Sequence, residues 1–146
     1  MNPNATRRNS ALAVALYECF NPVPLGFFAA AWIFDIIYLQ SYNPMWTKSA
    51  SWLIAFGLII AIIPRLINLA QVWVGASWRQ TSAVKVDFWA NLLAMVLAIF
   101  NAFVHSRDAY AVAPAGVILS TLVVLLICFA NVQLALRLRN AEGAAR

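Results

Sequence analysis

Charged residues are scarce in this sequence. Asp, Glu, Lys and Arg together make up 10% of its 146 residues, whereas hydrophobic residues make up 64%. A typical soluble domain carries about 25% charged residues. The mean hydropathy of +0.79 agrees with this comparison. The composition therefore disfavours a water-soluble domain and predicts a chain that lies in a lipid bilayer.

Cysteine and histidine are scarcer still, with two and one in the chain. Two cysteines are too few for a disulfide framework, and one histidine with two cysteines gives no metal-site spacing. His105 alone cannot supply both axial ligands of a haem within one chain, and a hydrogen-bonding cap is its expected role. No nucleophile elbow, glycine-rich phosphate loop or catalytic histidine pairing is present. We therefore expect no catalytic residues, no metal and no cofactor.

The net charge of +5 does not indicate nucleic-acid binding. The Lys and Arg residues lie at the edges of apolar runs and form no basic patch, with Arg65 as the exception. Retention of positive charge on the cytoplasmic side of a membrane explains this distribution better.

Four apolar segments are long enough to cross a bilayer, which takes a helix of about 20 residues. We expect spans at about 24–42, 51–74, 87–104 and 114–136. Together they predict an all-α, integral membrane four-helix bundle over residues 21–139.

The flanking segments are expected to lie outside the bundle. Residues 1–20 form the N-terminal segment, in which 8–20 is predicted to be a short amphipathic helix at the membrane interface. Residues 140–146 form a tail after the last span.

The distribution of Lys and Arg predicts the orientation. The two termini and the loop between the second and third spans hold seven of them, against Lys48 and Arg107 on the other side. Cytoplasmic segments carry the excess of such residues. We therefore expect both termini in the cytoplasm and the protein in a bacterial inner membrane.

Arg65 follows Pro64 inside the second expected span. A charged Arg at the centre of a membrane helix costs about 2.5–3.5 kcal/mol, so it normally faces a partner, a cavity or the headgroups. Asp35 in the first span and Asp87 at the start of the third are both candidate partners. The sequence leaves the choice between them open.

The third span has the clearest periodicity in the chain. Its polar and small residues are spaced 4, 3, 4, 3 and 4 apart, so they share one face of a helix. We expect this face to contact protein and not lipid. The face consists of Asp87, Asn91, Ala94, Ala98, Asn101 and His105.

A polar seam inside the membrane follows from these positions. It combines the polar members of that face with residues of the first two spans, namely Asp35, Arg65 and Asn68. Close helix packing is predicted at two pairs of small residues four apart, Gly26 with Ala30 and Gly116 with Ser120.

Short motifs between Asn21 and Leu136 resemble a known family. They include Pro22-x-Pro24-Leu25-Gly26, Asp35-Ile36-x-Tyr38, Asn43-Pro44-x-Trp46, Arg107-Asp108 and Pro114-x-Gly116. In these motifs the chain resembles the bacterial membrane proteins of the domain-of-unknown-function 2231 family. The resemblance implies a four-helix membrane protein of undetermined activity, with relatives that occur beside redox modules such as Rieske domains. It also implies that histidines of relatives are replaced here by Asn21 and Asp87.

These observations favour a non-catalytic membrane protein that is an accessory or structural subunit of a larger membrane complex. The family resemblance points to a respiratory or redox complex. Its expected partners are the lipid bilayer and other membrane subunits or further copies of the chain. One alternative is a redox protein that holds haem or quinone between its helices. A second is a small transporter that uses Asp35, Arg65 and Asp87.

Overall fold

The computed structural model describes residue 15 and residues 19–74 and 82–144. All regular structure in this part of the chain is helical. The helices are α2 (Val23–Ser41), α3 (Pro44–Val74), α4 (Ser82–His105), the one-turn α5 (Ala109–Val112) and α6 (Ala115–Ala144). Of the interfacial helix predicted over residues 8–20, only residues 15, 19 and 20 are described, and these are helical. The rest of that prediction lies outside the described residues.

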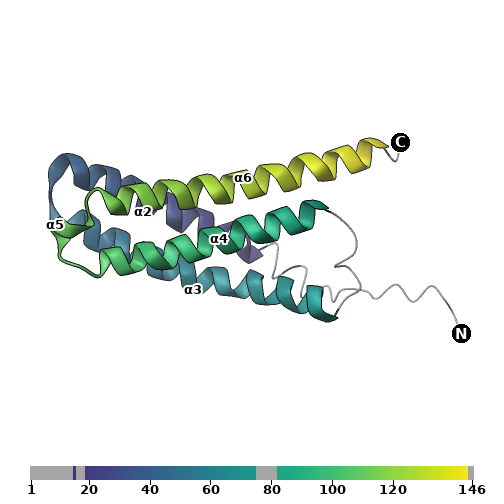
Figure 1. Cartoon of the computed structure of the whole chain (residues 1–146), viewed down its shortest axis with the longest axis horizontal. Coiled ribbons are helices and arrows are strands. Elements are labelled where there is room, and N and C mark those ends of the chain that lie inside the picture. The colour runs from purple at the N-terminus through teal and green to yellow at the C-terminus, as the bar shows by residue number, and fades with distance from the viewer. Residues whose placement is uncertain (1–14, 16–18, 75–81, 145–146) are drawn as a thin grey trace, which may run out of the picture.

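The four long helices run side by side as a bundle (Figure 1). Helix α2 packs against α3 and α6, and α4 packs against α6 and α3, so the four helices form a closed ring. Helix α5 lies at the end of the bundle where α4 turns into α6, and it contacts α3 and α4 (Figure 1). This end is called the α5 end below.

Four segments of these helices are long and apolar enough to cross a membrane: Val23–Ser41, Pro44–Leu66, Val86–His105 and Ala115–Arg137. The number of spans predicted from the sequence is thereby confirmed. Helix α6 continues beyond its span to Ala144, so most of the predicted tail is helical.

The second helix starts earlier than expected, at Pro44 and not near residue 51. The connection from α2 consists of Tyr42, in a left-handed conformation with φ of 50°, and Asn43. The Asn43 side chain accepts a hydrogen bond from the Met45 N–H at 3.0 Å. Such a bond satisfies an N–H group that a helix start leaves without a backbone partner, and proline suits the first helical position. Helix α3 then continues through Pro64.

Small and polar residues share the interior with a few large ones, among them Phe28, Tyr38 and Ile54, and many large apolar residues cover the outside. On α4, all six residues of the predicted protein-facing stripe are at most 8% exposed, which confirms that prediction. Fully buried alanines line the other helices, among them Ala50 and Ala130, whereas Trp52 is 66% exposed. Packing through small residues with large side chains outside suits a bilayer, because lipid tails solvate apolar groups as well as other side chains do.

Candidate functional site

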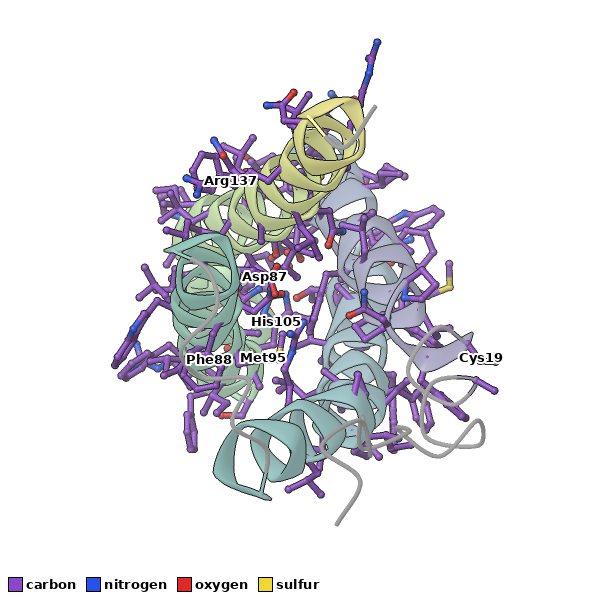
Figure 2. All side chains as sticks on the ribbon, turned by 90° about the vertical axis from the view of Figure 1, so that its right-hand side faces the viewer. Cys19, Asp87, Phe88, Met95, His105 and Arg137 are labelled. Carbon is purple, nitrogen blue, oxygen red and sulfur yellow. The ribbon has the colours of Figure 1, made fainter. Side chains whose placement is uncertain are left out.

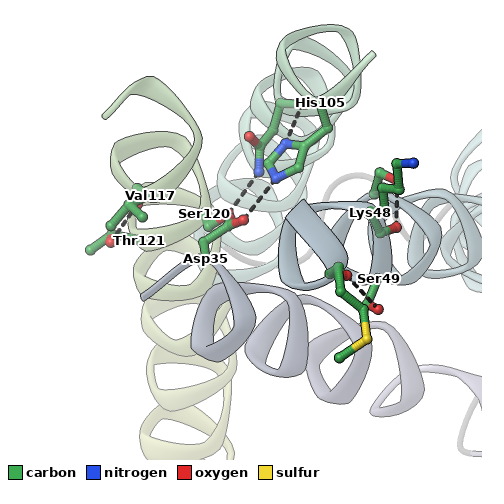
Figure 3. Close-up of polar contacts among 10 residues, drawn as sticks. Asp35, Lys48, Ser49, His105, Val117, Ser120 and Thr121 are labelled. Atoms are coloured by element: carbon green, nitrogen blue, oxygen red, sulfur yellow. Dashed lines mark hydrogen bonds and ion pairs between the residues drawn. The ribbon is translucent and has the colours of Figure 1, made fainter. Parts of the chain in front are cut away.

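The first polar cluster joins α2, α4 and α6 towards the α5 end (Figure 3). It consists of Asp35, Asn101, His105 and Ser120, and we call it the His105 cluster. His105 Nε2 lies 2.7 Å from Asp35 Oδ1, and His105 Nδ1 lies 2.9 Å from the backbone oxygen of Asn101. The Ser120 hydroxyl donates to Asp35 Oδ2 and accepts from Asn101 Nδ2 at 2.8 Å. Four buried side chains from three helices thus form one hydrogen-bonded network.

Gly116 allows α6 to approach this cluster closely. A Cβ atom at Gly116 would lie 2.6 Å from Val112 Cγ1 and 3.0 Å from His105 Cε1. Contacts this short are strained, so the site accepts only glycine without movement of its neighbours. Gly116 is thus a point of close approach between α6, α5 and the His105 side chain.

Of the other pair, Gly26 and Ala30, Gly26 makes no such close contact within the described part of the chain. Gly26 is exposed, and a Cβ atom there would face open space, away from the rest of the bundle. The close approach of α2 and α3 occurs instead at Gly57. There a Cβ atom would lie 3.0 Å from Phe28 Cε1 and 3.1 Å from Phe27 Cβ.

The second polar cluster joins α3 to α4 and consists of Arg65, Asp87 and Asn91. Arg65 Nη2 donates to Asn91 Oδ1 at 2.6 Å. Asn91 Nδ2 in turn donates to Asp87 Oδ1 and to the Asp87 backbone oxygen, each at 2.9 Å. Of the two candidate carboxylates, Asp87 is therefore linked to Arg65 through Asn91, whereas Asp35 belongs to the His105 cluster. We call this group the Arg65 cluster.

The Arg65 cluster lies at the ends of the candidate spans. Arg65 is the next-to-last residue of Pro44–Leu66, and Asp87 is the second residue of Val86–His105. Charged groups cost less near the headgroups than at the bilayer centre. By length and composition, Arg65 and Asp87 are thus both near the ends of their candidate spans. The side chain of Asn68, the remaining member of the predicted seam, lies outside the described residues.

The predicted seam is two separate clusters. Asn91 and Asn101 are about 15 Å apart along α4, from the helical rise of 1.5 Å per residue. Between them the stripe consists of Ala94 and Ala98, which belong to the hydrophobic core together with Ile54 and Ile127. Viewed along the bundle, Asp87 and His105 both point to its interior (Figure 2).

An apolar pocket of about 410 Å³ lies between α3 and α4 beside the Arg65 cluster. Its walls include Leu58, Ile62, Phe88 and Met95, and the Arg65 side chain borders it. This pocket could receive a hydrocarbon chain or an apolar side chain.

The His105 cluster does not have the arrangement of a hydrolytic or metal site. Both ring nitrogens of His105 are engaged by Asp35 and Asn101, so neither is free to ligate iron. The Ser120 hydroxyl donates to the carboxylate and not to the imidazole, whereas a serine nucleophile needs the imidazole as its base. Among the described residues, no three His, Cys, Asp or Glu side chains are grouped to hold a metal.

The sequence predicts His105 to be a hydrogen-bonding cap at the end of its helix and does not pair it with Asp35. The structure places it against Asp35, which lies 70 residues earlier in the chain. The sequence signal for this contact was the spacing that puts His105 on the polar face of α4. That spacing does not indicate which helix the face contacts.

Comparison with known protein families gives a match over most of the chain. The family described as "Predicted membrane protein (DUF2231)" matches residues 20–139. No curated protein and no solved structure matches the chain. The family match includes all four candidate spans and confirms the resemblance seen in the sequence. The chain belongs to the DUF2231 family and is a multi-pass membrane protein with four candidate spans.

Proposed function

We propose that this protein is a non-catalytic subunit that packs against other membrane proteins within the bilayer. The observation that carries the proposal is the division between the inside and outside of the bundle. The two polar clusters hydrogen-bond internally, between α2, α4 and α6 and between α3 and α4. Large apolar side chains cover the outside. The polar groups of such a bundle stabilise the bundle itself, and its apolar outer surface is left to contact neighbouring membrane proteins.

An exposed aromatic group on α2 and α3 supports this proposal. Trp52 and Phe56 stack with ring centroids 5.9 Å apart, and Phe27 lies 6.4 Å from Phe56. Trp52 lies about 12 Å along the helix from Pro44, at the rise of 1.5 Å per residue. Tryptophan usually lies at the membrane interface, where its N–H can reach water or headgroups. A neighbouring helix would cover Trp52 at this depth better than lipid would.

Gly26 lies on the outward side of α2, with open space beside it. Outward small residues let a second helix approach closely in a membrane. A partner subunit or a second copy of the chain is therefore the expected neighbour. Respiratory complexes are the first partners to examine, because the family resemblance implies redox surroundings.

The orientation and the membrane are part of the proposal. Exposed Arg137 and Arg139 lie at the end of α6 remote from α5, whereas Lys48 and Arg107 lie towards the α5 end. The excess of positive charge near the termini supports cytoplasmic termini and a bacterial inner membrane.

The two alternatives have less support. Haem binding would need a free nitrogen on His105, and both are engaged. A quinone could still enter the pocket between α3 and α4. Transport would need a polar path, but the core around Ala94 and Ala98 separates the two clusters.

Native mass spectrometry of the protein purified from its own membranes in mild detergent tests the proposal. We expect a complex with other subunits or with a second copy. Gly26→Leu should weaken that complex, because its side chain extends outward and disturbs no internal contact. Ala135→Leu places the same side chain at an exposed position on α6 and serves as the control.

A strictly monomeric protein without partners in native membranes would contradict the proposal. A Soret band or bound quinone in the purified protein would support the redox alternative instead. Solute or proton flux in liposomes that Arg65→Leu abolishes would support a transporter.

A further inference from the structure

We propose that Asp35 and His105 share a single proton as a net-neutral pair, which holds α2, α4 and α6 together. This inference is independent of the proposed partners. It follows from the donors and acceptors of the His105 cluster, taken one atom at a time.

The hydrogen on His105 Nδ1 is fixed by its neighbour. Nδ1 lies 2.9 Å from the backbone oxygen of Asn101, and a carbonyl oxygen can only accept. Nδ1 must therefore carry a hydrogen, since two facing lone pairs at this distance would repel. The bond selects the ring form in which Nδ1 is the donor.

The hydrogen of the Ser120 hydroxyl is fixed in the same way. Asn101 Nδ2 donates to Ser120 Oγ, so the hydroxyl hydrogen is left for Asp35 Oδ2. Asp35 Oδ2 is therefore an acceptor, and only Oδ1 remains to face the imidazole.

Asp35 Oδ1 and His105 Nε2 lie 2.7 Å apart, which requires one proton between them. Without it, two lone pairs would face each other, and with two protons, two donors would. The proton can lie on the carboxyl or on the imidazole, but the pair has zero net charge in either case.

The surroundings favour this neutral state. The Asp35 and His105 side chains are 1% and 0% exposed. The other described titratable groups towards this end are Tyr38 on α2, Tyr42 after α2, Lys48 on α3, Arg107 and Asp108 after α4, and Tyr110 on α5. Among these only Tyr38 is buried, so apart from His105 itself no described cation is buried beside Asp35.

Loss of the shared proton would leave an uncompensated buried carboxylate against a lone pair of the ring. The contact between α2 and α4 would then become repulsive. The proton is therefore part of the structure that fixes these helices.

The chain is well suited to a direct test because His105 is its only histidine. If the protein is labelled with ¹⁵N-histidine and purified through an affinity tag that contains no histidine, all ring signals come from His105. We expect a hydrogen on Nδ1 in the NMR spectrum at neutral pH. A neutral ring with its hydrogen on Nε2 and none on Nδ1 would overturn the proposal.

Substitution of Asp35 gives a second test. Asp35→Asn keeps an acceptor for Ser120 and supplies an N–H to His105 Nε2 without charge. We expect its thermal midpoint in detergent to stay close to wild type. Asp35→Leu and His105→Leu break the network and should lower the midpoint by about 5–10 °C.

Asp108→Asn is the control, because it removes the same charge from an exposed position. An Asp35→Asn protein as unstable as Asp35→Leu would show that the carboxylate itself is required, and would also overturn the proposal. If the Asp35 variants do not fold, the NMR measurement on the wild-type protein still decides the matter.

Discussion

Replacement of Gly116 by alanine should destabilise the bundle, whereas the same replacement at Gly26 should not. The added methyl group at Gly116 would lie 2.6 Å from Val112 Cγ1 and 3.0 Å from His105 Cε1. The His105 ring cannot turn away without loss of its bonds to Asp35 and Asn101. At Gly26 the methyl group would meet open space.

The expected size follows from two opposing terms. Alanine is favoured over glycine inside a helix by about 0.8–1.0 kcal/mol, and both variants gain this term. Overpacking of a well-packed interior costs about 1–3 kcal/mol, and only Gly116→Ala incurs it. The difference between the two variants is therefore about 1–3 kcal/mol, because the helix term cancels. For a chain of this length this is a difference in thermal midpoint of about 2–12 °C.

Thermal unfolding of both variants in the same detergent measures this difference. The ¹⁵N signals of His105 should also change in Gly116→Ala and stay unchanged in Gly26→Ala. If Gly116→Ala were as stable as Gly26→Ala, with an unperturbed histidine, then α6 would not approach His105 as closely as described.

Three further predictions concern other parts of the bundle. Asn91→Leu should lower the free energy of unfolding by about 1–3 kcal/mol, because it removes the acceptor of Arg65 and the donor to Asp87; an unchanged stability would mean that the Arg65 cluster adds nothing. A double-mutant cycle of Trp32→Phe and Thr121→Val should give a coupling of about 0.6 kcal/mol for the 2.9 Å bond between α2 and α6, and zero coupling would contradict it. In a protein without Cys19 and Cys128, Ser106→Cys should react with an impermeant maleimide from outside the cell and Gly143→Cys only after permeabilisation, whereas the reverse pattern would refute cytoplasmic termini.

The spans and the α4 stripe were predictable because each depends on local properties of the chain. Length and hydropathy define a span, and the spacing of Asn91, Ala94, Ala98 and Asn101 defines a face. Polar residues in a membrane helix turn inward whatever the neighbouring helices are. This explains why the stripe could be predicted before its partners were known.

The partner of Asp35 could not be predicted in this way. His105 and Ser120 are distant in sequence, and their contact with Asp35 depends on which helices are neighbours. The start of the second helix was expected near residue 51, whereas α3 begins at Pro44. The side chain of Asn43 provides that start, and its capping role was not recognised.

The outward position of Gly26 has a simple geometric cause. Before Asp35, helix α2 is apolar on all sides, so a pair of small residues there does not indicate which side faces inward. Asp35 carried the missing information, because nine residues on a helix of 100° per residue place it on the side opposite Gly26. An inward Asp35 therefore requires an outward Gly26, as found.

The amide of Asn91 has a further consequence for the Arg65 cluster. An amide presents an acceptor on one side and donors on the other, so it can join a cation to an anion without carrying charge itself. Here its oxygen faces Arg65 and its nitrogen faces Asp87. The amide cannot turn over, because its nitrogen also donates to the Asp87 backbone oxygen and a turned amide would set two acceptor oxygens against each other. The backbone of α4 therefore fixes the amide oxygen towards α3, so the position facing it on α3 must supply a donor.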